Sequence, residues 1–233
     1  MRDRRGIGHA ETGKHVFLCE MAGELEGEAV LDLGCGVGWF EDYAVKQRCS
    51  RVVGVDNDEV RLERARRRVP GATFISGDAV AINTDIGTFT VVAMFDFLEH
   101  LPRDSVPAVL LSAANLLQKG GRLLISVPYR GLVSTTLDMT FYLGHRHYKR
   151  LQMRALLYDA GFKVSRIQFG GGIWEHMSMI WLYIFKYIFA REMPFSTFLE
   201  KKRLGEYQNP RSIPRSDTAT MFVEAKNWGH VSC

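Results

Sequence analysis

Cysteine is scarce in this sequence, and the few cysteines are not grouped. The 233 residues contain four cysteines and no Cys-x-x-Cys pair. Such spacing provides neither a disulfide framework nor a zinc site, so we expect reduced thiols in a cytoplasmic protein. The four residues are Cys19, Cys35, Cys49 and Cys233.

The beginning of the chain lacks the apolar run of a secretory signal. Arg2, Arg4 and Arg5 come first, and no apolar stretch follows them directly. We therefore expect no signal peptide. Internal repeats and low-complexity tracts are missing too, and the length fits one large domain or one domain with an insertion.

A strong excess of one charge is also missing. The chain has 30 lysines and arginines against 26 acidic residues, a net charge of +4. This mild balance permits attraction to an anionic surface but does not predict nucleic-acid binding. Apolar residues make up 46% of the sequence, which is enough for a full core.

Strand and helix patterns alternate along most of the chain, which predicts a parallel sheet with helices on both faces. The predicted strands are Ala29–Leu33, Arg51–Val55, Thr73–Ser76, Thr90–Phe95, Arg122–Val127, Phe162–Phe169 and Thr218–Ala225. The predicted helices are Thr12–Ala22, Trp39–Gln47, Glu59–Val69, Ser105–Gln118 and Arg150–Ala160.

These elements divide the chain into four parts. We expect residues 1–28 to form an N-terminal helical cap and residues 29–171 to form the core of the domain. Residues 172–217 form an apolar helical insertion followed by a loop from Gly205 to Asp217, and residues 218–233 return to the core as a final strand and tail. Long connections of this kind in compact domains are usually functional or disordered.

Three glycines at alternate positions follow the first predicted strand. Gly34, Gly36 and Gly38 leave the backbone free for close approach of a ligand at the start of a helix, where N–H groups are unpaired. Asp32 lies just before them and would repel a pyrophosphate. A ligand with an amine or a positive sulfur is favoured, and Trp39 occupies the third glycine position of a dinucleotide fingerprint.

Acidic residues follow the second and third predicted strands. Asp56 comes about 20 residues after the glycine turn, and a carboxylate there can accept hydrogen bonds from both hydroxyls of a ribose. The alternative is a strand-end cap. Asp78 lies in the Gly77-Asp78-Ala79 turn and would by itself be an ordinary turn residue.

Five ordered motifs between Val30 and Gly171 resemble the class I S-adenosylmethionine-dependent methyltransferases. They are Leu31–Gly38, Val52–Asp56, Ser76–Ala79, Val91–Leu101 and Leu117–Ile125. The resemblance implies a Rossmann-like α/β fold, with a seven-stranded, mostly parallel sheet, helices on both faces and an antiparallel C-terminal strand. It also implies S-adenosyl-L-methionine as the cofactor.

The resemblance assigns roles to residues at the ends of the strands. The glycines pass under the methionine part of the cofactor, whose amine lies near Asp32. Asp78 accepts from the adenine amino group, and the Ala79 backbone meets the ring. The cofactor-binding residues implied are Asp32, Gly34, Cys35, Gly36, Gly38, Asp56, Asn57, Gly77, Asp78, Ala79 and Phe95.

Three histidines are candidates for a general base, because histidine is well tuned to take up a hydroxyl proton. His145 and His147 lie in the long connection after the fifth strand, and His100 follows the fourth. Each could instead hydrogen-bond the backbone or pack against it. Asp96, Glu99 and His100 also resemble the Glu-x-x-Glu-His of ubiquinone-pathway O-methyltransferases, which can hold a divalent cation. We expect no metal and keep this as a minor alternative.

The segment Ile173–Ala190 is apolar and rich in Trp, Tyr and Phe, which suits a membrane interface. Arg191, Lys201, Lys202 and Arg203 follow and could meet anionic headgroups. We therefore expect residues 173–203 to bind a membrane surface peripherally. The alternatives are a buried helix, a dimer interface and a membrane-spanning helix.

Together these features predict a cytoplasmic, membrane-peripheral enzyme that methylates oxygen in a small hydrophobic or lipid-like acceptor. N- or C-methylation, a non-catalytic S-adenosylmethionine-binding module and a nicotinamide-dependent oxidoreductase remain alternatives. A nucleic-acid methyltransferase is disfavoured, because no Asn-Pro-Pro-Tyr or Asp-Pro-Pro-Tyr element follows the fourth strand.

Overall fold

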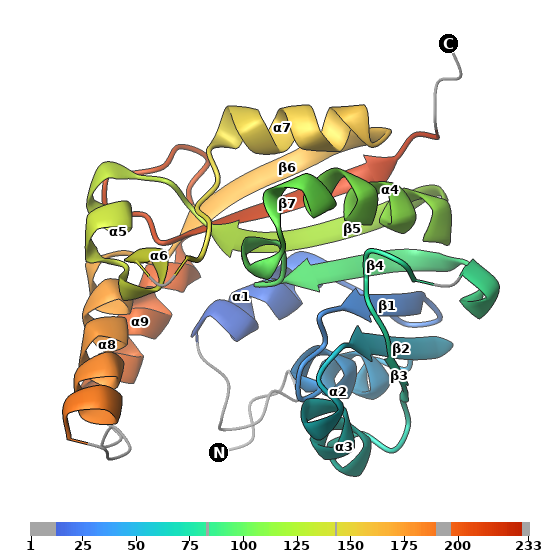
Figure 1. Cartoon of the computed structure of the whole chain (residues 1–233), viewed down its shortest axis with the longest axis horizontal. Coiled ribbons are helices and arrows are strands. Elements are labelled where there is room, and N and C mark those ends of the chain that lie inside the picture. The colour runs from blue at the N-terminus through green and yellow to red at the C-terminus, as the bar shows by residue number, and fades with distance from the viewer. Residues whose placement is uncertain (1–12, 83, 143, 190–196, 230–233) are drawn as a thin grey trace.

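The computed structural model describes residues 13–82, 84–142, 144–189 and 197–229. Their centre is a seven-stranded sheet in the order β3-β2-β1-β4-β5-β7-β6 (Figure 1). The strands are β1 (Ala29–Leu33), β2 (Arg51–Asp56), β3 (Thr73–Ser76), β4 (Phe89–Phe95), β5 (Leu117–Pro128), β6 (Phe162–Gly170) and β7 (Thr220–Asn227). Thr12, Ala190, Arg191 and Cys233, which the sequence analysis singled out, lie outside the described residues.

The direction of the strands confirms the predicted fold class. The pairs β1–β2, β1–β4, β2–β3 and β4–β5 are parallel. The last strand, β7, is antiparallel to both β5 and β6, between which it lies. The carboxyl ends of β1, β2, β3, β4 and β5 therefore meet at one edge of the sheet.

Helices cover both faces of the sheet. The longer helices are α1 (Gly13–Ala22), α2 (Trp39–Lys46), α3 (Glu59–Arg68), α4 (Val106–Leu116), α7 (Arg150–Asp159), α8 (Ile173–Tyr183) and α9 (Thr197–Gln208). The short ones are α5 (Leu132–Leu137), α6 (Met139–Tyr142) and the 3₁₀ turns η1 (Thr84–Ile86), η2 (Leu98–His100) and η3 (Arg103–Ser105).

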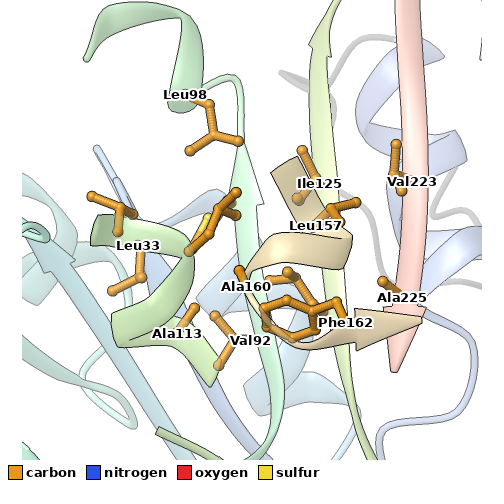
Figure 2. Packing of buried hydrophobic residues seen from close by; sticks show 14 of the residues in the cluster. Leu33, Val92, Leu98, Ala113, Ile125, Leu157, Ala160, Phe162, Val223 and Ala225 are labelled. Carbon is orange, nitrogen blue, oxygen red and sulfur yellow. The ribbon is translucent and has the colours of Figure 1, made fainter. Parts of the chain in front are cut away.

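Alternate residues of a strand point to opposite faces, which divides the core into two parts. Val92 of β4 packs with α4 and α7, as Ala113 and Leu157 show in Figure 2. Its neighbour Val91 packs on the other side with α1 and α2, through residues such as Phe40. Both faces of the central strands are thus apolar, as expected for a parallel sheet between helices.

Some element boundaries differ from the sequence-based prediction. The fourth helix ends at Leu116 and not at Gln118, because Leu117 pairs with Phe89 and already belongs to β5. The final strand lies two residues later than predicted, since its pairing with β6 continues to Asn227. The long connection after β5 contains α5 and α6.

The apolar insertion contains α8, a π-helix and α9, and the loop that follows them is shorter than predicted. After α8 the chain continues as a π-helix, η4 (Ile184–Ile188), and α9 extends to Gln208, four residues into the predicted loop. Tyr207 explains the extension, because it is buried and packs against Phe222 of β7. Helices α8 and α9 lie side by side (Figure 1), and no described helix is long and apolar enough to span a bilayer.

Candidate active site

The parallel strands change order between β1 and β4, with β2 and β3 on one side and β5 on the other. Loops leaving neighbouring strands at such a point run in opposite directions, and the space between them is where ligands bind in open α/β sheets. The glycine turn leaves β1 here, and Asp96 directly follows Phe95, the last residue of β4. The predicted site therefore lies at a topological switch point.

The glycine turn presents bare backbone to this space. Gly34, Gly36 and Gly38 have φ values of +83°, +56° and +75°, a region that side chains disfavour. A Cβ on Gly34 would lie 2.4 Å from the Phe97 ring, whereas a Cβ on Gly36 would have nothing within 4 Å. Gly34 is thus required for packing, and Gly36 leaves open space in front of the turn.

Asp56 connects the end of β2 to this turn. Its Oδ2 accepts a 2.9 Å hydrogen bond from the Gly36 amide, and its Oδ1 accepts one of 2.9 Å from the Asp58 amide. Each carboxylate oxygen has a second lone pair for another donor. Asn57 is exposed beside it. The carboxylate is therefore more than a strand-end cap, because it also fixes the conformation of the turn.

Two further carboxylates lie buried behind the turn. Asp32 Oδ1 and both oxygens of Glu41 have no hydrogen-bond partner among the described residues. Burial, followed by the nearby Asp56, raises the pKa of Asp32 to about 8. Burial and Asp32 raise the pKa of Glu41 well above its ordinary range. Unpaired buried carboxylates fit a cationic ligand group, which would supply the missing countercharge.

Sequence reasoning identified Asp32 but missed Glu41. The Glu41 side chain from α2 packs against β2, where a Cβ on Gly54 would lie 2.4 Å from Oε1. The only local signal was an acidic residue in the first turn of a helix, which is common. Cys35 is buried in the same place, and burial followed by Glu41 raises the pKa of its thiol.

The turn after β3 completes this side of the site. The Gly77 amide donates to the Asp56 carbonyl at 3.1 Å, so the two turns are in contact. Asp78 is exposed, and its Oδ1 accepts from the Val80 amide at 2.9 Å, while Ala79 is buried. The structure therefore brings the turns after β1, β2 and β3 together.

Helix α1 covers the switch point, where three rings lie in contact: His15 of α1, Trp39 of α2 and Phe95 of β4. The His15 ring lies 4.4 Å from Trp39, and Trp39 lies 5.6 Å from Phe95 at the end of β4. Burial, and then the adjacent Lys14, lower the pKa of His15 to about 4, so this ring is neutral at physiological pH. Sequence analysis placed a helical cap here but identified neither Lys14 nor His15.

The two candidate histidine segments meet at the same edge. The loop around His145 packs on η2, where the Arg146 amide donates to the Glu99 carbonyl at 3.3 Å. The rings of His100 and His145 lie edge to face at 4.4 Å. Desolvation and the neighbouring His145 lower the pKa of His100 below its ordinary value. His100 is exposed and His145 half-buried, so a ligand can reach both.

His147 differs from these two histidines in its surroundings. Its side chain is 1% exposed, and its Nε2 lies 3.0 Å from Asp138 Oδ2. The ring also packs at 5.2 Å from Phe141. A base that takes a proton from a ligand must come within hydrogen-bond reach of it, so this position favours a supporting role.

Asp96, the first residue of the minor metal-site alternative, has two side-chain partners in the structure. Within the described ranges, no three His, Cys, Asp or Glu side chains converge to hold an ion. Asp96 instead lies 2.5 Å from the ammonium of Lys14 and accepts from Ser126 Oγ at 2.8 Å. Each oxygen of the carboxylate keeps a second lone pair for a further donor.

Comparison with protein families and proteins agrees with the geometry. A family model described as a methyltransferase domain matches residues 30–121. A protein of Mycolicibacterium smegmatis described as a probable S-adenosylmethionine-dependent methyltransferase is 29% identical over 151 residues, 64% of this chain and 58% of that protein. The ubiquinone biosynthesis O-methyltransferase of Vibrio parahaemolyticus is 34% identical over 125 residues, 51% of each chain. Phosphoethanolamine N-methyltransferase 1 of Triticum aestivum is 28% identical over 167 residues, 67% of this chain and 33% of that protein.

Solved structures share the fold at low identity. An S-adenosylmethionine-dependent methyltransferase from Mesorhizobium loti matches with a TM-score of 0.65 and 19% identity, over 94% of this chain and 100% of that chain. Magnesium protoporphyrin IX methyltransferase from Synechocystis, solved with S-adenosylhomocysteine, matches with a TM-score of 0.57 and 21% identity, over 96% and 84%. The chain spans less than two thirds of the length of the curated relatives named above, so the likeness concerns the domain.

Proposed function

We propose that the protein transfers a methyl group from S-adenosyl-L-methionine to a small acceptor, because residues 30–121 match the model of a methyltransferase domain. The observation that carries the proposal is the space in front of Gly36, beside the carboxylates of Asp56 and Asp32. Asp32 Oδ1 has no hydrogen-bond partner among the described residues. Gly36 lets a ligand approach the backbone closely. Asp56 can accept hydrogen bonds from hydroxyl groups, and Asp32 can supply a countercharge for an amine.

The residues at the strand ends would hold the cofactor. Asp56 would accept from the ribose hydroxyls, Asp78 would accept from the adenine, and Asp32 would face the amine. When bound, S-adenosylmethionine supplies an electrophilic methyl group on a positive sulfur. The contribution of the chain is to align this group with the acceptor and to exclude water, since alignment alone can lower the barrier by several kcal/mol.

We place the acceptor under helix α1, where it would meet the aromatic group of Trp39, Phe95 and His15. A hydrophobic, lipid-like acceptor with a hydroxyl group fits this apolar wall. The ubiquinone O-methyltransferase relative supports the same chemistry. His145 and His100 are accessible and could take up the hydroxyl proton. His147 is enclosed beside Asp138 and would have a structural role in the same loop.

A second candidate is methyl transfer to nitrogen, which the acidic side chains at the carboxyl end of β4 favour. Buried Glu99 has an oxygen, Oε2, without a hydrogen-bond partner among the described residues, and its pKa is raised by burial, Asp96 and Asp138. An amine in this position would find carboxylates to hold it. The phosphoethanolamine N-methyltransferase relative is consistent with this alternative.

We further propose that the α8–α9 segment binds an anionic membrane surface peripherally. Large apolar side chains are exposed along it: Ile173, Met177, Trp181, Leu182, Ile188, Phe189 and Phe198. The ammonium of Lys202 lies 5.6 Å from the rings of both Trp174 and Phe198. Aromatic rings beside lysine are typical of protein that lies at a membrane interface. Flotation with liposomes at low salt tests this, and absence of binding would favour a dimer interface.

Calorimetry with purified protein tests the main proposal. We expect saturable heats with S-adenosylmethionine and S-adenosylhomocysteine and none with NAD. Release of S-adenosylhomocysteine in the presence of paired alcohol and amine acceptors then distinguishes transfer to oxygen from transfer to nitrogen. Binding without release across the acceptors would favour a non-catalytic module, and absence of binding would contradict the proposed function.

A further inference from the structure

A lysine from the first helix reaches the end of the fourth strand. Lys14 Nζ lies 2.5 Å from Asp96 Oδ2, although the two residues are distant in sequence. The side chains are 20% and 35% exposed, in contrast to the buried Asp32 and Glu41. The pair is therefore a charged contact that a ligand at the switch point can reach.

Asp96 is held in an unusual backbone conformation. Its φ of +50° is uncommon for a residue other than glycine, and such strain is concentrated at functional sites. Ser126 Oγ donates to Asp96 Oδ1 at 2.8 Å and accepts from the Asp96 amide at 3.0 Å. The carboxylate thus has a fixed direction, set by β5 on one side and Lys14 on the other.

The surroundings of the pair combine rings and charges. Phe95 precedes Asp96, and His15 follows Lys14 and lies against Trp39. The charged or titratable groups that face Lys14 are Asp96, Glu99 of η2 and Glu175 of α8, with Arg203 of α9 acting on the neighbouring His15. A polar ligand group held by the pair would therefore have an apolar body packed against aromatic rings.

We propose that Lys14 and Asp96 together bind the reacting hydroxyl of the acceptor, with Asp96 accepting a hydrogen bond from it and Lys14 donating one to its oxygen. This inference rests on the proposed function, because it concerns the acceptor of the same reaction. A hydroxyl is both donor and acceptor and matches the pair, whereas a protonated amine has no acceptor. The substrate class is a phenol or similarly acidic hydroxyl on an apolar body.

The pair would act on the charge of the acceptor oxygen. The hydroxyl proton passes to one of the two accessible histidines, His100 or His145, and the ammonium of Lys14 stabilises the oxyanion that remains. An electron pair of this oxygen forms the new O–C bond, while the electrons of the broken S–C bond return to sulfur as a neutral thioether. An opposite charge within about 4–6 Å typically lowers the pKa of an acid by 1–3 units.

A phenol whose ionisation is visible tests the inference without turnover. The probe is 4-nitrophenol, titrated by absorbance against the wild type in the presence of S-adenosylhomocysteine. We expect the bound probe to have a pKa at least about 1 unit below that of the free probe. Lys14→Met should abolish this shift and Lys14→Arg should keep most of it.

Lys46→Met is the matched control. Lys46 Nζ also lies 2.5 Å from an aspartate, Asp42, but on the outer surface of α2. This variant should leave the shift unchanged. Lys14→Met leaves Asp96 without its cationic partner and could prevent folding. The double variant Lys14→Met with Asp96→Asn then replaces it, because it leaves no charge without a partner. It too should abolish the pKa shift of the bound probe.

The outcomes separate this inference from the proposed function. A probe that does not bind, or that binds with an unshifted pKa in the wild type, overturns the role of Lys14. A shift that persists in Lys14→Met does the same. If S-adenosylhomocysteine fails to bind, the proposed function fails, and titration of the probe alone still reports whether Lys14 holds an oxyanion.

Discussion

The amide of Gly36 donates a 2.9 Å hydrogen bond to Oδ2 of Asp56. This contact ties the turn after β1 to the end of β2, so the carboxylate has both a structural and a ligand-facing role. Hydrogen bonds to a charged group contribute about 1.5–3 kcal/mol each. We expect Asp56→Ala to weaken S-adenosylhomocysteine binding at least about 10-fold, measured by calorimetry.

The control for this variant is Asp58→Ala. The Asp58 side chain caps α3 by accepting from the amides of Val60 and Arg61. Loss of a helix cap costs about 1 kcal/mol of stability. This variant should therefore have a lower melting temperature but an unchanged affinity for the cofactor. A comparable loss of affinity in both variants would contradict the ligand role of Asp56.

Substitution of two glycines with similar backbone conformations distinguishes loss of ligand contact from backbone strain. Gly36 and Gly120 both have positive φ, and a Cβ on either would meet nothing within 4 Å. Each change to alanine should destabilise the protein by about 1–2 kcal/mol, because alanine disfavours this conformation. Only Gly36→Ala should also lower cofactor affinity, since its methyl group enters the proposed ligand space. Equal affinities of the two variants would show that no ligand lies against Gly36.

Cofactor binding should become tighter as the pH rises towards 8. The pKa of Asp32 is raised from 3.8 to about 8 by burial and by Asp56, so the residue carries a proton at pH 7. A cationic ligand favours the ionised form, and binding should therefore release a proton. Calorimetry in two buffers with different ionisation enthalpies measures this release, which Asp32→Asn should remove.

The same pKa shift has an opposite effect on the stability of the ligand-free protein. The folded state keeps a proton on Asp32 that the unfolded state loses above about pH 4, so the contribution of this group falls as the pH rises from 4 to 8. Asp32→Asn should flatten that fall in chemical denaturation. An unchanged fall in the variant would mean that the pKa of Asp32 is not raised in the folded protein.

A buried ion pair holds α9 against α8. Arg203 donates from Nε and Nη2 to the two oxygens of Glu175 at 2.9 and 3.1 Å. Removing one partner of such a pair costs about 3–5 kcal/mol, because the other charge is left buried. Arg203→Met should thus destabilise the protein far more than the double change of Arg203 and Glu175 to methionine. Urea denaturation of the three proteins gives the comparison, and similar midpoints for both variants would refute it.

Alanine variants of His145 and His147 should differ in whether they lower kcat or the melting temperature. His145 is half-buried beside His100, whereas His147 is enclosed next to Asp138. General bases contribute about 10²–10⁴-fold to rate, so His145→Ala should lower kcat within that range and leave melting unchanged. His147→Ala should mainly lower the melting temperature. Full turnover in His145→Ala would remove that residue from the candidates.

Much of the fold could be predicted because its signals are local. The first and third strands have the predicted bounds, Ala29–Leu33 and Thr73–Ser76. The glycine turn could also be read from the sequence, since positive φ is a property of single residues. By contrast, the extension of α9 to Gln208 depends on a buried tyrosine that packs against a strand further along the chain.

The sequence by itself determined the order of the elements, the strand-end carboxylates and the bare backbone at Gly36, because periodicity and backbone preference act over a few residues. Only the tertiary structure decided which distant side chains meet. Lys14 faces Asp96, His15 lies on Trp39, and Glu41 is buried behind Asp32. These contacts depend on how α1 and α2 pack across the edge of the sheet, and no local pattern specifies that packing.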